Sequence, residues 1–165
     1  MARRVEVAAN LAIVFVGVAI MATLLTNRLG IGRSHPSDPI GTRLKLDGVD
    51  WRGHPSLLLA LSVGCHFCTE SADFYRKLAA ECRKDGLHLS AALPQPENES
   101  KSYLLNLGVH VDDVKQVSLS SLGVDGTPTL LLVDSSGIVK KAWVGKLQAE
   151  REQQVLGAVR SATGR

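Results

Sequence analysis

The chain has 165 residues, of which 45% are apolar and 21% charged, a composition typical of one globular domain that excludes a disordered chain. Its formal net charge of +3 comes from the first 33 residues, because fifteen Lys or Arg balance fifteen Asp or Glu from residue 34 onward. A domain with balanced charge has no surplus of cations to hold phosphate groups. We therefore expect no nucleic-acid binding.

The first predicted element is an uncharged apolar segment, VAANLAIVFVGVAIMATLLT, from Val7 to Thr26. At ~1.5 Å per residue, a helix of this length spans about 30 Å, the thickness of the hydrocarbon core of a bilayer. We predict an N-terminal flank at 1–6, a single-pass transmembrane anchor at 7–26 and a polar linker at 27–39. A cleaved signal peptide and a buried soluble helix are the alternatives, although no small-x-small cleavage motif follows the segment.

Residues 40–165 predict one α/β domain. Alternation at 42–46 indicates a strand, and the continuous apolar run PSLLLALSV at 55–63 indicates a strand buried on both faces. Apolar residues recur at three- and four-residue spacing over 69–84, which predicts a helix that ends at Gly86. A second strand is predicted at 87–93.

The second half of the domain continues the alternation of strands and helices. We predict a helix at 99–107, a brief strand at 109–111, and a turn with a short helix within 112–122. A strand hairpin (129–133 and 138–144) and a last helix (147–161) complete the chain. This order predicts a central mixed sheet with helices on both faces, parallel where helices connect strands and antiparallel at the hairpin.

A CxxC motif, Cys65-His66-Phe67-Cys68, lies where the first buried strand gives way to a helix. The free N–H groups and the positive end of the helix dipole at such a junction favour a thiolate, which is the nucleophilic form of cysteine. We predict that Cys65 attacks and that Cys68, one turn further along the apolar stripe, resolves the mixed disulfide. His66 and Phe67 are predicted to tune the reactivity of the pair.

A metal site and two inert thiols are the competing interpretations of this motif. One CxxC supplies only two of the four ligands of a structural zinc. The third cysteine, Cys82, lies on the same predicted helix about 20 Å from Cys68 at helical rise, and is better interpreted as a core residue. We therefore expect no metal and no bound cofactor.

The CxxC and the later Gly126-Thr127-Pro128-Thr129, taken together, resemble the thioredoxin family. The apolar segment and the linker resemble its membrane-anchored, TlpA-like branch, and the likeness covers about 40–161. This resemblance implies a thioredoxin fold with a cis peptide bond before Pro128, packed beside the CxxC. It also implies that the backbone of Thr127 pairs with the extended chain of a substrate.

Three positions depart from the family pattern. Gly64 stands where an aromatic residue usually precedes the first cysteine, and Phe67 stands where proline is common. Leu59 occupies the place of the acidic residue that thioredoxins bury before the motif. The nearest carboxylate, that of Glu70, is expected to face solvent. These departures leave the redox potential and the direction of electron flow open.

We expect a membrane-anchored thiol–disulfide oxidoreductase that acts on protein thiols and disulfides and exchanges electrons with a second dithiol protein. The resemblance implies a domain on the periplasmic side of the inner membrane and a role in cytochrome c maturation or extracytoplasmic redox homeostasis. Cationic residues flank both ends of the apolar segment, so they do not determine its orientation. A tethered metallochaperone that uses Cys65, Cys68 and His66, and a non-catalytic adaptor domain, are the alternatives.

Overall fold

The computed structural model describes residues 15, 21, 39–44, 46, 51 and 53–164. The predicted flank at 1–6, nearly all of the predicted anchor at 7–26 and the predicted linker up to residue 38 lie outside the described residues. In the part of the chain that is described, no helix has the length and apolar character needed to cross a membrane. The chain divides into two units, Met1–His35 and Pro36–Arg165, and the second contains the sheet and the CxxC motif.

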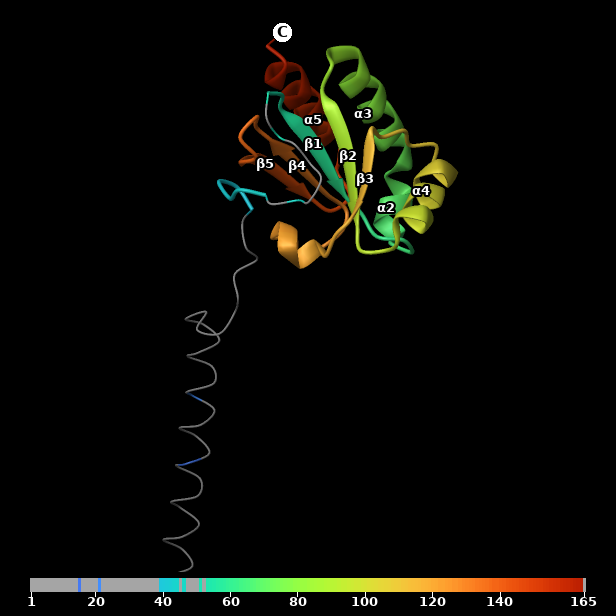
Figure 1. The fold of residues 1–165 in the computed structure, drawn as a ribbon. Helices are drawn as coiled ribbons and strands as arrows, with labels where there is room; N and C mark the ends of the chain where they lie inside the picture. The colour runs from blue at the N-terminus through green and yellow to red at the C-terminus, as the bar shows by residue number, and fades with distance from the viewer. Residues whose placement is uncertain are drawn as a thin grey trace, which may run out of the picture. The chain divides into compact units, whose positions relative to one another are not determined.

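Five strands form one mixed sheet in the order β3-β2-β1-β4-β5 (Figure 1). Three of them, β1 (Ser56–Ala60), β2 (His88–Leu93) and β3 (Asp113–Gln116), are parallel. The other two, β4 (Thr129–Val133) and β5 (Val139–Val144), form the predicted hairpin, and β4 pairs antiparallel with β1. Every residue of β1 and β4 is buried, which explains why both read as continuous apolar runs.

The helices are α2 (His66–Glu70), α3 (Ala72–Asp85), α4 (Glu97–Asn106) and α5 (Ala149–Ala162). The prediction of one continuous helix over 69–84 was wrong, because the helix is interrupted at Ser71. The hydroxyl of Ser71 donates to the carbonyl of Phe67 at 2.8 Å, and the backbone of Ser71 departs from helical geometry (φ −90°, ψ 3°). A serine that bonds back to a carbonyl four residues earlier commonly bends a helix.

The two faces of the sheet are covered differently. One face packs against α3 and α5 through an apolar core that includes Leu57, Leu59 and Cys68. The other face is covered by the 3-10 helix η1 (Leu119–Leu122) and by the segment before β1 that contributes Leu44 and Leu46. The sequence predicted helices on both faces of the sheet. Within the described residues, the α-helices cover one face, and the other face has one short 3-10 helix.

Two predicted strands differ from the structure. Among the residues of 42–46 that the structure describes, there is only an isolated bridge between Arg43 and Ile138. The brief strand predicted at 109–111 lies instead at Asp113–Gln116. Its alternating valines mislead because the N–H of Val109 donates to the carbonyl of Leu104 at 3.0 Å and completes the end of α4. Val109 therefore belongs to the helix terminus and the core, and pairing with β2 begins later.

Candidate active site

The site lies at the C-terminal end of β1, where a short turn leads into α2. The N–H of Cys65 donates to the carbonyl of Ser62 at 3.2 Å and closes this turn. Gly64 adopts φ +79°, a left-handed conformation that strains other residues, although the space around it would admit a side chain. The turn leaves Cys65 as the N-cap of α2, just outside the helix.

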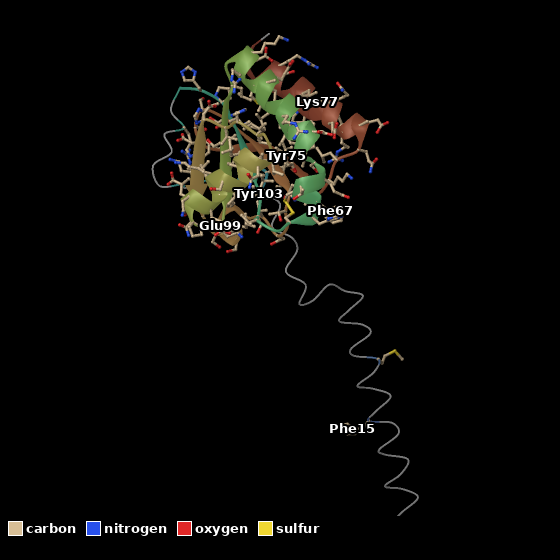
Figure 2. All side chains as sticks on the ribbon, turned by 90° about the vertical axis from the view of Figure 1, so that its right-hand side faces the viewer. Phe15, Phe67, Tyr75, Lys77, Glu99 and Tyr103 are labelled. Carbon is tan, nitrogen blue, oxygen red and sulfur yellow. A yellow bond between two sulfur atoms is a disulfide. The ribbon has the colours of Figure 1, made fainter. Side chains whose placement is uncertain are left out.

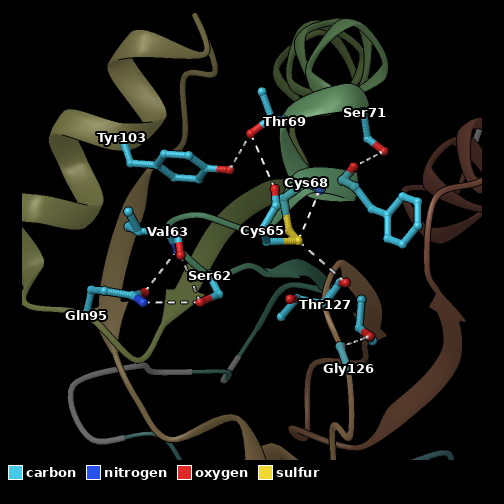
Figure 3. Close-up of a disulfide and its surroundings, with 12 residues drawn as sticks. Ser62, Val63, Cys65, Cys68, Thr69, Ser71, Gln95, Tyr103, Gly126 and Thr127 are labelled. Carbon is cyan, nitrogen blue, oxygen red and sulfur yellow. Dashed lines mark hydrogen bonds between the residues drawn. A yellow bond between two sulfur atoms is a disulfide. The ribbon is translucent and has the colours of Figure 1, made fainter.

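A disulfide joins Cys65 to Cys68, with 5.2 Å between their Cα atoms (Figure 3). Cys68 has no exposed surface and contributes to the core, whereas Cys65 is partly exposed. The backbone N–H of Cys68 donates to Sγ of Cys65 at 3.1 Å. A donor in this position stabilises negative charge on the Cys65 sulfur when the disulfide is reduced. The accessible sulfur is therefore also the one that the backbone favours as a thiolate.

The Gly126–Thr129 segment lies directly against this disulfide, although about sixty residues separate the two motifs. The carbonyl oxygen of Thr127 is 3.6 Å from Sγ of Cys65, and the Thr127–Pro128 peptide bond is cis. Pro128 is buried, and its carbonyl accepts from the N–H of Gly145 at 2.7 Å. The fold thus brings Thr127 and Pro128 to the side of the disulfide.

Glu70, at the end of α2, contacts two basic side chains: His66 on the same helix and Lys146 in the loop that follows β5. Glu70 Oε1 lies 3.2 Å from Nε2 of His66, and Glu70 Oε2 accepts from Nζ of Lys146 at 3.1 Å. The hydrogen bond from Lys146 is the main cause that lowers the pKa of Glu70, and the charge of His66 acts in the same direction. Glu70 is on the surface, as expected, and it joins α2 to the loop that follows β5.

Phe67 is the largest exposed apolar group next to the disulfide. Phe67 stands between the two cysteines in the sequence, and it remains 53% exposed. Figure 2 shows it at the surface of the domain, close to the yellow disulfide bond. The rings of Phe67 and His66 are 5.7 Å apart and tilted. The fold thus leaves a bulky apolar side chain uncovered beside the disulfide.

Four polar residues beside the motif were not identified from the sequence: Ser62, Thr69, Gln95 and Tyr103. Gln95 Oε1 accepts from the N–H of Val63 at 3.2 Å, and Gln95 Nε2 donates to Oγ of Ser62 at 3.1 Å (Figure 3). The hydroxyls of Tyr103 and Thr69 are 3.4 Å apart. Ser62 and Thr69 lie close to the CxxC in the sequence, which is the one signal that could have drawn attention to them. Their partners, Gln95 and Tyr103, are more than thirty residues further along the chain and have no such signal.

The other candidate residues do not join the site. Leu59 is fully buried in β1 and offers no carboxylate. Cys82 is a free, buried thiol on α3, and burial is the main cause that raises its pKa to about 12. Within the residues that the structure describes, no group of three or more His, Cys, Asp or Glu is placed to hold a metal ion.

Comparison with solved structures identifies the fold. A secreted disulfide oxidoreductase from Mycobacterium tuberculosis, homologous to DsbE of E. coli, is similar with a TM-score of 0.55 and 16% identity over 73% of this chain and 93% of the other. A thiol:disulfide interchange protein from Bacteroides sp. has a TM-score of 0.55 and 18% identity, covering 76% of this chain and 86% of its own.

The thioredoxin domain of a thiol-disulfide oxidoreductase from Bacteroides vulgatus has a TM-score of 0.54 and 16% identity, over 72% of this chain and 96% of the other. No family model matches the sequence, and no curated protein does. At these identities the likeness concerns the fold. The chain has the thioredoxin fold, which confirms the fold predicted from the CxxC and Gly-Thr-Pro-Thr motifs.

Proposed function

We propose that this protein is a thiol–disulfide oxidoreductase that acts on protein thiols and disulfides through Cys65 and Cys68. The observation that carries this proposal is the asymmetry of the disulfide. One sulfur is partly exposed and accepts a backbone N–H, whereas the other is fully buried. An attacking thiol must reach its substrate, and a resolving thiol needs only to reach its neighbour. This geometry favours Cys65 for the first role and Cys68 for the second.

The reaction proceeds by two exchanges. In the reduced protein, the thiolate of Cys65 attacks one sulfur of a substrate disulfide, and the other substrate sulfur leaves as a thiolate that takes a proton from solvent. Cys68 then loses its proton and attacks Sγ of Cys65. The second substrate sulfur leaves, and the Cys65–Cys68 disulfide forms. Two electrons have passed to the substrate, and the reverse sequence oxidises a substrate dithiol.

The backbone of Thr127 is suited to hold the substrate chain during this exchange. Its carbonyl lies 3.6 Å from the attacking sulfur, so an extended chain that pairs with Thr127 brings its own sulfur next to Cys65. Phe67, which lies between the two cysteines in the sequence, adds an uncovered apolar surface next to the disulfide. His66 and Phe67 lie between the cysteines, where they affect the stability of the thiolate and hence the potential.

The test is to trap the mixed disulfide. In Cys68→Ser, Cys65 can attack a substrate but the intermediate cannot be resolved, so we expect mixed disulfides with partner proteins on non-reducing gels. The matched control Cys65→Ser should trap none. Reversible oxidation of the wild-type pair by glutathione, seen as a two-Dalton mass change, completes the test. A wild-type pair that glutathione does not oxidise and reduce, or equal trapping by both variants, would contradict the proposal.

We also propose that the segment from Val7 to Thr26 is an uncleaved membrane anchor that places the domain on the periplasmic side of the inner membrane. Its length and lack of charge support the anchor. The disulfide chemistry supports the compartment, because such pairs function where substrates form disulfides. Cytochrome c maturation and general redox homeostasis are the roles that fit this place. Protease treatment of intact spheroplasts should degrade the domain, and its protection would contradict the orientation.

A further inference from the structure

The short segment of chain around Cys65 cannot by itself fix the position of this residue. It is the N-cap of α2, a helix of only five residues that is interrupted at Ser71, and it follows Gly64, which has no side chain to anchor the turn. Helices this short are not stable in isolation, since the first turn fixes several residues for one hydrogen bond. Contacts from elsewhere in the fold must therefore keep Cys65 in place.

The first such contact comes from Gln95, in the loop between β2 and α4. Its side-chain amide makes two bonds at once: it accepts from the N–H of Val63 at 3.2 Å and donates to Oγ of Ser62 at 3.1 Å. These are the residues two and three positions before Cys65. The amide thus holds the turn that leads into the motif, on the N-terminal side of Cys65.

The second contact comes from Tyr103 on α4 and reaches Cys65 through Thr69. The hydroxyl of Thr69 donates to the carbonyl oxygen of Cys65 at 3.3 Å. Because Thr69 has a single hydroxyl proton, Tyr103 is the donor in the 3.4 Å contact between the two hydroxyls. The result is a chain of two consecutive hydrogen bonds from Tyr103 to Thr69 to Cys65, in which each bond polarises the next.

We propose that Gln95 and Tyr103 are positioning residues that fix the chain just before and just after Cys65. In this way they set how strongly the Cys65–Cys68 disulfide is favoured over the dithiol. The inference rests on the proposed function. The equilibrium between dithiol and disulfide depends on how often the two sulfurs meet, which is their effective concentration. A segment held at both ends keeps the sulfurs close, and a loosened one lets Cys65 move away from Cys68.

The experiment measures the glutathione equilibrium constant of the Cys65–Cys68 pair in the full chain. We expect Tyr103→Phe and Gln95→Met each to disfavour the disulfide about three- to tenfold, and the double variant to disfavour it further. Ser102→Ala is the control for the first, since Ser102 is exposed and its hydroxyl donates only to the carbonyl of Asn98 within the same helix. Gln153→Met, exposed on α5, is the control for the second, and neither control should change the constant by more than about twofold.

A purely structural role makes a different prediction. It would lower the melting temperature of the oxidised and reduced forms equally and leave the glutathione constant unchanged, and that outcome would overturn the inference. Thr69→Val keeps the shape of the side chain and removes both the bond from Tyr103 and the bond to the Cys65 carbonyl, so it gives an independent measurement if Tyr103→Phe folds poorly. A wild-type pair that does not exchange with glutathione would instead contradict the proposed function.

Discussion

At the scale of single residues, the surroundings of each cysteine determine how reactive its thiol is. The Cys65 sulfur accepts an N–H and is partly exposed, whereas Cys82, on the buried side of α3, is surrounded by core residues that raise its pKa to about 12. The two thiols have the same chemistry in the unfolded chain. We therefore expect alkylating reagents at neutral pH to modify reduced Cys65 and to spare Cys82.

Asp134, at the turn between β4 and β5, allows a test of pH dependence at one residue. Its Oδ1 accepts from the hydroxyl of Ser136 at 2.6 Å and from the N–H groups of Ser136 and Ile138. The hydroxyl of Ser136 is the main cause that lowers the pKa of Asp134 to about 2. A carboxylate with a lowered pKa stabilises the fold above its unfolded pKa of about 4, and this contribution is lost as pH falls towards 2.

We expect Asp134→Asn to lower the free energy of unfolding at pH 7 by about 1 kcal/mol. This is less than the full pKa shift implies, because solvent screens a side chain that is 29% exposed. Urea denaturation at several pH values checks the sign, since the variant should lose less stability than wild type between about pH 4 and pH 2. Asp125→Asn is an exposed control. Equal pH dependence in wild type and Asp134→Asn would contradict the assignment.

At the scale of helices and strands, glycine has opposite effects at two positions. Gly86 ends α3 with φ +72°, and the N–H of Leu87 donates to the carbonyl of Cys82 at 2.9 Å. Gly157 lies inside α5, and a Cβ added there would meet no atom within 4 Å. A side chain is strained in the first position and favoured in the second.

This contrast predicts changes of opposite sign for the same substitution. Gly86→Ala should destabilise the protein by about 1 kcal/mol, because alanine in a left-handed conformation is strained. Gly157→Ala should stabilise it by about 0.5–1 kcal/mol, because alanine loses less backbone entropy on entering a helix. Thermal unfolding of both variants is the measurement. A gain in stability for Gly86→Ala would mean that α3 does not end in a left-handed residue.

Across the domain, burial is greatest in the centre of the sheet, and the site lies at the end of one central strand. β1 and β4 are buried along their entire length and pair with each other through five residues, whereas the edge strand β3 is partly exposed. The disulfide lies beyond the end of β1 and joins the N-cap of the short helix α2 to Cys68 within it. Such an arrangement lets the site adjust while the core persists.

Native-state hydrogen exchange tests this distribution. The amides of β1 and β4 should exchange only through global unfolding, and those of α2 and β3 through local opening at a lower free energy. Reduction of the disulfide should speed exchange in α2 much more than in β4. Equal acceleration in α2 and β4 would show that the disulfide stabilises the whole domain and not the site alone.

Elements with a local cause could be predicted from the residues alone. The short apolar runs of β1 and β4 indicate buried strands, and the CxxC at a strand-to-helix junction places one sulfur outside the helix and one inside it. The break at Ser71 could not be predicted in this way, because a serine next to an apolar stripe is compatible with a continuous helix. The hydrogen bond from its hydroxyl to the carbonyl of Phe67 is visible only in the structure.

The distant groups that meet at the disulfide were set by the assembly of the sheet. Gln95 and Tyr103 lie beside the residues that flank Cys65 because the strand order places β2 next to β1, with α4 following β2. The carbonyl of Thr127 reaches Cys65 because β4 pairs with β1 on the other side. No periodic pattern in the sequence indicates either contact. Hydrogen bonds between distant segments depend on the order of the strands in the sheet, whereas periodic patterns report only the spacing of residues along one strand or helix.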